Sequence, residues 1–118
     1  MMQEKTVVNL DYLQSLSKGN KKFEADMIRL FLEEVPSEIS QLQEGIDKED
    51  YGKIRAAAHK MKSTIPFAGV DRVIGNELSS VEQLAREGHN LQVIQDEFRK
   101  IRQACETACR ELKNFSVS

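Results

Sequence analysis

Apolar residues recur at three- and four-residue intervals along most of this chain, and this spacing constrains the fold more than any other feature. The last long segment shows it best, because its apolar positions form one seam on a helix: Leu91, Ile94, Phe98, Ile101, Cys105, Ala108 and Leu112. No stretch alternates apolar and polar residues as a half-buried strand requires. We therefore predict an all-α protein.

The segment from Asn20 to Ile46 is predicted to be one long helix. Asn20 is a suitable N-cap, and Pro36 is expected to bend the helix where it interrupts the backbone hydrogen bonds. The apolar stripe consists of Phe23, Met27, Leu30, Phe31, Val35, Ile39, Leu42 and Ile46. The acidic residues of the segment are interpreted as a solvated face, namely Glu24, Asp26, Glu33, Glu34 and Glu38.

Two further long helices and one short helix complete the set. One is predicted from Asp50 to about Phe67, with Asp47 or Asp50 as its cap, and the next from Asp71 to Arg86. Residues 9–16 are expected to form a short leading helix. Four long amphipathic helices with short connections pack most simply as an antiparallel up-down-up-down four-helix bundle, because a short connection makes the next helix reverse direction. Residues 1–8 and 115–118 are expected to fray.

Length and charge exclude several classes of protein. The chain has 118 residues, which fits a single domain over residues 1–118. Its 17 Lys and Arg against 19 Asp and Glu give a formal net charge of −2, without the basic excess that nucleic-acid binding usually needs. Its apolar runs are far shorter than the roughly 20 residues that span a bilayer, and residues 1–6 hold no signal-peptide core. We expect a cytoplasmic protein with no membrane insertion, for which nothing requires more than a monomer.

Cys105 and Cys109 are interpreted as packing residues. They lie four positions apart on one predicted helix, which is poor geometry for a disulfide. The two His and two Cys of the chain match no zinc-ligand spacing. We therefore expect neither a disulfide nor a metal ion of the protein's own.

The predicted helix over residues 50–67 carries the candidate site. At about 100° per residue, four apolar positions face the core, namely Ile54, Ala58, Met61 and Ile65. His59 falls at about 140° from Ile54, on the outer side. Small or cationic residues share its exposed face: Gly52, Arg55, Ala56, Lys62, Ser63 and Pro66. Because glycine is a poor residue for a helix interior, Gly52 indicates that something approaches this face closely.

This surface suits phosphoryl chemistry. A neutral imidazole is a competent nucleophile near pH 7, because one ring nitrogen keeps a lone pair. Lys62, one turn beyond His59, can neutralise an arriving phosphoryl group. No separate acid or base is in reach by sequence, which fits a reaction in which positioning and charge stabilisation do most of the catalysis. The alternative is an exposed histidine without a chemical role.

The residues around His59 resemble the signature of histidine-containing phosphotransfer (HPt) domains. The stretch is Ala57-Ala58-His59-Lys60-Met61-Lys62-Ser63-Thr64, followed by Gly69 and a helix from about Asp71. Matched by position, His59 corresponds to the phosphorylated histidine, Met61 to an apolar position, Lys62 to the lysine near the phosphoryl group, and Gly69 to a later turn glycine. Ser63 stands where glycine is commonest. The family fold is a four-helix bundle with a short leading helix, so the likeness covers essentially the whole chain.

The resemblance implies a phosphoryl carrier that shuttles the group between aspartates of receiver domains through phosphorylated His59. Its partners would be the receiver domains of response regulators or of a hybrid histidine kinase, and Mg²⁺ would be supplied by the receiver. Lys62 would stabilise phosphoryl charge. The surface that meets the receiver would consist of Gly52, Arg55, Ala56, Lys60, Ser63, Pro66 and Phe67.

A kinase and a non-phosphorylated adaptor are the two alternatives to this carrier. The chain has no Gly-rich nucleotide-binding loop, so it is not expected to be a kinase. The rival hypothesis is a non-phosphorylated helical adaptor, a degenerate HPt domain, which binds signalling partners through the same face.

Overall fold

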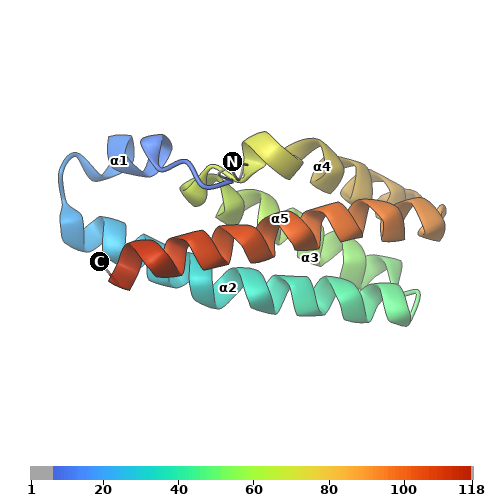
Figure 1. The fold of residues 1–118 in the computed structure, drawn as a ribbon. Helices are drawn as coiled ribbons and strands as arrows, with labels where there is room; N and C mark the ends of the chain where they lie inside the picture. Colours follow the sequence, from blue (N-terminus) through green and yellow to red (C-terminus); the bar gives the residue numbers. More distant parts are fainter. Residues whose placement is uncertain (1–6, 118) are drawn as a thin grey trace, which may run out of the picture.

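A computed structural model describes residues 7–117, and this part of the chain consists of helices without a strand (Figure 1). The elements in order are α1 (Asp11–Ser17), α2 (Lys21–Asp47), α3 (Tyr51–Thr64), the 3-10 helix η1 (Ile65–Ala68), α4 (Asp71–Glu87) and α5 (Leu91–Val117). The prediction of an all-α protein is confirmed. None of the helices within residues 7–117 is long and apolar enough to cross a membrane.

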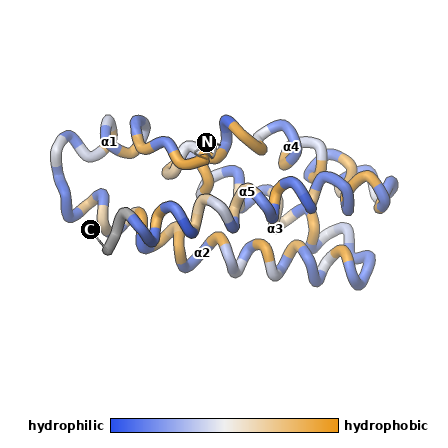
Figure 2. Tube along the Cα trace, viewed as in Figure 1, coloured by the Kyte–Doolittle hydropathy of each residue, from blue (hydrophilic) through white to orange (hydrophobic). Residues whose placement is uncertain are grey.

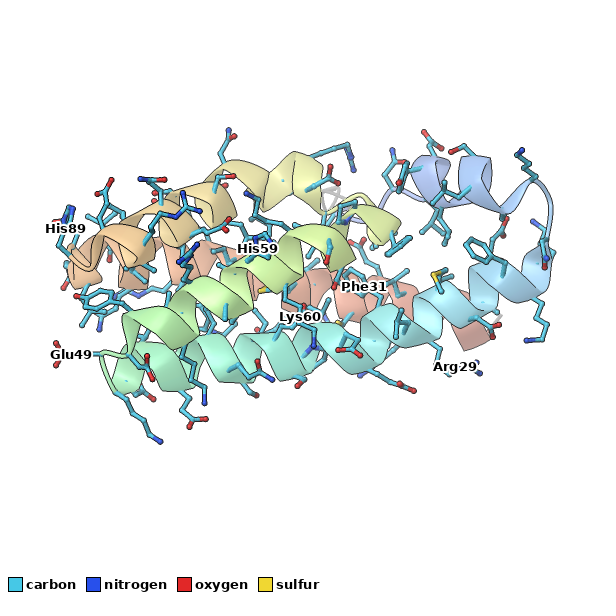
Figure 3. All side chains as sticks on the ribbon, turned by 180° about the vertical axis from the view of Figure 1, so that it is seen from behind. Arg29, Phe31, Glu49, His59, Lys60 and His89 are labelled. Carbon is cyan, nitrogen blue, oxygen red and sulfur yellow. The ribbon has the colours of Figure 1, made fainter. Side chains whose placement is uncertain are left out.

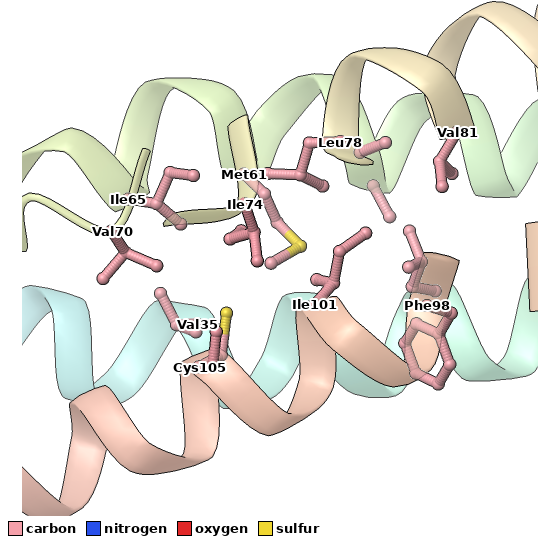
Figure 4. Packing of buried hydrophobic residues seen from close by; sticks show 14 of the residues in the cluster. Val35, Met61, Ile65, Val70, Ile74, Leu78, Val81, Phe98, Ile101 and Cys105 are labelled. Atoms are coloured by element: carbon pink, nitrogen blue, oxygen red, sulfur yellow. The ribbon is translucent and has the colours of Figure 1, made fainter. Parts of the chain in front are cut away.

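The four long helices enclose one core. Helix α2 contacts α3 and α5, and α4 contacts the same two helices. Hydrophobic residues recur about once per turn along each long helix, with hydrophilic residues between them, which is the pattern of amphipathic helices around a shared interior (Figure 2). Figure 4 shows part of that interior, where Met61 of α3 packs among Ile74 and Leu78 of α4 and Ile101 of α5. The four residues predicted to face the core from residues 54–65 are all buried.

Local sequence explains where α2 and α3 begin and end. Asn20 caps α2 by accepting a hydrogen bond from the amide of Phe23 at 3.0 Å, and Asp50 caps α3 in the same way from Lys53. Helix α2 continues through Pro36. Helix α3 ends at Thr64, earlier than predicted, because Pro66 has no amide hydrogen to continue the hydrogen-bond ladder and the chain turns into η1.

The structure differs from the expected fraying at Val7 and Val8. The Glu111 side chain on α5 accepts hydrogen bonds from both of their amides, at 3.1 and 2.8 Å to Oε1, and Val8 is buried. The next amide, that of Asn9, donates to the carbonyl of Ala68 in η1 at 2.8 Å. At the other end α5 continues to Val117, whereas residues 1–6 and 118 lie outside the described part of the chain.

Two predictions about the faces of α2 are wrong. Glu38, expected on the solvated face, is fully buried, and its Oε1 has no hydrogen-bond partner among the described residues. Leu30, expected in the apolar stripe, is exposed. Glu38 lies three positions after Val35 and four before Leu42, so it shares their side of the helix. Its position on the helix, and not its polarity, decides its burial.

The two cysteines are free and buried, as the sequence indicates. Burial is the main reason why the pKa of Cys105 rises to about 12, and it raises the pKa of Cys109 as well. Both thiols therefore stay protonated and unreactive near neutral pH, which fits a packing role.

Candidate functional site

His59 lies on the exposed side of α3, beside α4 (Figure 3). Its side chain is 77% exposed, whereas its neighbour Ala58 is completely buried. The helical phase of α3 produces this contrast, because Ala58 and Met61 occupy the core face and leave His59 pointing outward. The orientation predicted for His59 is confirmed.

Glu82 of α4 connects the two residues on which the predicted site depends. Its Oε2 lies 2.9 Å from His59 Nδ1, and its Oε1 accepts a hydrogen bond from Lys62 Nζ at 3.0 Å. The Glu82 side chain is only 9% exposed, so the carboxylate is held firmly between the helices. The expectation that no acid or base is in reach of His59 is therefore wrong.

Helical spacing around His59 does not point to Glu82, because Glu82 lies 23 positions further along the chain, on another helix. A usable signal was present. Leu78 is a core residue of α4, and a residue four positions later is rotated by only about 40° from it. A carboxylate at the edge of the core stripe must face a neighbouring helix, where it needs a cationic or hydrogen-bonding partner.

The electrostatics of the cluster determine which ring nitrogen of neutral His59 carries the hydrogen. The hydrogen bond from Lys62 is the largest reason why the pKa of the Glu82 carboxyl lies below its usual value; burial opposes this, and the His59 contact adds to it. An ionised carboxylate can only accept hydrogen bonds, so Nδ1 of His59 carries the hydrogen and donates it. The lone pair of the neutral ring is then on Nε2. Arg86 adds a second cation, with its Nη2 3.8 Å from Glu82 Oε2.

The remaining predicted site residues on α3 lie around His59 with different partners. Arg55 and Ala56 are exposed. Lys60 is also exposed, but its Nζ lies 3.4 Å from Glu34 Oε2 on α2, so this ammonium group turns toward α2. Ser63 donates its hydroxyl hydrogen to the carbonyl of Lys60 at 2.8 Å, which directs the hydroxyl group to the helix backbone.

Gly52, Pro66 and Phe67 mark the two ends of this face. Gly52 lies in the first turn of α3, not in the helix interior, and a β-carbon there would meet Asp50 Oδ1 at an ordinary 3.5 Å. No close packing within the described residues therefore demands glycine at this position. Pro66 and Phe67 are half-buried in η1, and the Phe67 ring lies 6.4 Å from that of Tyr12 on α1, measured between centroids.

The cluster can support a nucleophilic ring nitrogen next to a cation. The exposed side chain of His59 leaves Nε2 open to an approaching group, and Lys62, 41% exposed, supplies positive charge one turn away. Within the described residues, no group of three or more His, Cys, Asp or Glu side chains is placed to hold a metal ion.

A family model described as the Hpt domain matches residues 26–114, and this range includes all of α3 and α4. The protein therefore belongs to the Hpt domain family, and the resemblance found in the sequence is confirmed. Hpt domains take part in phosphotransfer in two-component phosphorelays, act as carriers, and interact with receiver domains. No curated protein and no solved structure matches the chain.

Proposed function

We propose that this protein carries a phosphoryl group on His59 between aspartates of receiver domains. The observation that carries the proposal is the orientation of the imidazole: Nδ1 is bound to Glu82, and Nε2 belongs to a side chain that is 77% exposed. An exposed nucleophilic nitrogen suits a reaction in which the second active site, with its aspartate and metal ion, comes from a partner protein.

The step is an in-line displacement at phosphorus. The Nε2 lone pair of His59 attacks the phosphorus of the receiver's aspartyl phosphate, and the phosphorus–oxygen bond breaks with its electron pair returning to the aspartate carboxylate. The hydrogen on Nδ1 stays on the ring, facing Glu82. The same steps in reverse deliver the group to a second receiver. Lys62 neutralises phosphoryl charge, and the receiver supplies Mg²⁺, so this chain needs no cofactor of its own.

The receiver is proposed to dock on the α3 face around His59. Gly52, Ala56 and Ser63 are small and keep the approach to Nε2 clear, whereas Arg55 and Lys60 supply positive charge. Pro66 and Phe67 add an apolar rim at η1. The proposed scaffold is the antiparallel up-down-up-down four-helix bundle with α1 as the leading helix, which the neighbour relations of α2 to α5 support. A monomer in the cytoplasm is sufficient for this role, and no autokinase activity is proposed.

The flow of phosphate between two receivers separates the carrier from the rival adaptor, because both hypotheses predict that His59→Gln leaves receiver binding intact. The His59→Gln variant should bind a receiver domain about as tightly as the wild type, because one exposed side chain contributes little to the fold, but it should block the onward flow of phosphate between two receivers. The matched control is His89→Gln, since His89 is exposed, contacts Glu87 and lies at the far end of α4 (Figure 3). Undiminished phosphate flow through the His59→Gln variant would contradict the proposal.

A further inference from the structure

Both oxygens of the Glu82 carboxylate are occupied by the groups that phosphorylation of His59 would involve. Oε1 holds the Lys62 ammonium group at 3.0 Å, and Oε2 faces His59 Nδ1 at 2.9 Å. The carboxylate is the fixed partner, because its side chain is 9% exposed against 41% for Lys62 and 77% for His59. Any charge that appears on the ring therefore interacts with a carboxylate that cannot turn away into solvent.

The first consequence concerns Lys62. In the structure its ammonium group is already paired with Glu82 Oε1. A phosphoryl group on Nε2 must compete with this carboxylate for the same ammonium group, and the existing pair is favoured by a charge-assisted hydrogen bond in a partly buried setting. The phosphoryl group is thus stabilised less than it would be by a lysine without an anionic partner.

The second consequence concerns the proton on Nδ1. A ring that carries phosphate on Nε2 and hydrogen on Nδ1 is positively charged, and a neighbouring carboxylate favours the charged form. When the phosphorus–nitrogen bond then breaks, its electron pair returns to Nε2 and the ring leaves as a neutral imidazole. Without the Nδ1 hydrogen it would have to leave as an anion, which is a far poorer leaving group.

We infer that Glu82 keeps the phosphorylated state of His59 reactive and short-lived, by competing with the phosphoryl group for Lys62 and by retaining the proton on Nδ1. The inference rests on the proposed function and concerns the regulation of the same site. Glu82 is a positioning residue that does not itself touch the phosphoryl group. It would favour rapid passage of phosphate to the next receiver over storage on His59.

The test compares Glu82→Gln with the wild type after phosphorylation by a phosphorylated receiver domain and Mg²⁺. The amide oxygen can still accept the hydrogen of Nδ1, but the carboxylate charge is gone and Lys62 is released. The variant should lose phosphate by hydrolysis at least about threefold more slowly, and should hold a larger phosphorylated fraction at equilibrium with the receiver. As pH rises and the phosphorylated ring loses its Nδ1 proton, the hydrolysis rate should fall. This fall should occur at a lower pH in the variant than in the wild type, because the variant ring gives up the Nδ1 proton more readily.

Glu87→Gln is the matched control. It removes the same charge from the same helix, and the Glu87 carboxylate contacts Gln83 and His89. This variant should behave as the wild type. An equal gain of lifetime in both variants would show a general charge effect and overturn the inference, as would an unchanged or shorter lifetime in a folded Glu82→Gln variant.

A spectroscopic measurement on the wild type keeps the inference testable if Glu82→Gln does not fold. The ¹⁵N NMR signals of phosphorylated His59 near neutral pH should show phosphate on Nε2 and hydrogen on Nδ1. A ring without hydrogen on Nδ1 would overturn the inference while leaving the carrier function intact. Failure of the wild type to accept phosphate at all would instead contradict the proposed function.

Discussion

Thr64, the last residue of α3, donates a hydrogen bond from its hydroxyl group to the buried carboxyl group of Glu38 on α2, across 3.2 Å. Glu38 is completely buried, and burial is the main cause that raises the pKa of its carboxyl group. The Thr64 hydrogen bond and the charge of Lys60 act in the opposite direction, whereas Glu34 adds to the rise. The contact joins the two helices one turn beyond His59.

The Glu38→Gln substitution should therefore change how stability depends on pH. With a raised folded-state pKa, the folded wild type holds a proton that the unfolded chain has released, so its free energy of unfolding falls as pH rises from about 4.5 to the folded-state pKa. The neutral amide has no such dependence. The free energy of unfolding of the variant minus that of the wild type should therefore increase over that pH range and stay constant above it.

Urea denaturation at a series of pH values measures this difference. Glu33→Gln serves as the control, because Glu33 is exposed on the same helix. A pH-independent difference between Glu38→Gln and wild type would contradict the account of Glu38.

Removing the Lys62 charge should slow phosphoryl transfer more than it weakens receiver binding. Lys62 lies one turn from His59, and the loss of a charge that stabilises a transferring phosphoryl group reduces rates by about tenfold or more. Rapid-quench transfer from a phosphorylated receiver to Lys62→Ala measures the effect. Lys53→Ala is a suitable control, since Lys53 lies on the same helix and pairs with Glu44. Equal transfer rates for Lys62→Ala and wild type would remove Lys62 from the mechanism.

Glycine is required at position 69 for two separable reasons. Gly69 has a φ of +73°, and a β-carbon there would lie 2.5 Å from the carbonyl oxygen of Asn9. Gly88 has a φ of +74° but nothing within 4 Å of such an atom. Gly88→Ala should thus lower the free energy of unfolding by about 1 kcal/mol from backbone strain alone.

Gly69→Ala should lower it by more than about 3 kcal/mol, because the clash adds to the strain. Chemical denaturation of the two variants measures the difference. Similar losses for both would mean that residues 7–9 do not pack against η1 as described.

The sequence predicts the parts of this structure that depend on local periodicity. The helical phase of residues 54–65 is sufficient to place His59 outside and Met61 inside. The same rule would have placed Glu38 inside, and the prediction failed because its charge was given more weight than its spacing. The pairing of Glu82 with His59 and the Glu111 contact with Val7 and Val8 depend on tertiary packing between distant segments, which single-helix patterns do not specify.

The central claim is that His59 becomes covalently phosphorylated. The most direct test is the intact mass of wild type, His59→Gln and His89→Gln after incubation with a phosphorylated receiver domain and Mg²⁺. We expect a single phosphoryl adduct on wild type and His89→Gln, labile in acid and stable in base as a phosphoramidate is, and none on His59→Gln. An adduct that persists in the His59→Gln variant, or no adduct on the wild type with any of several receivers, would contradict the account.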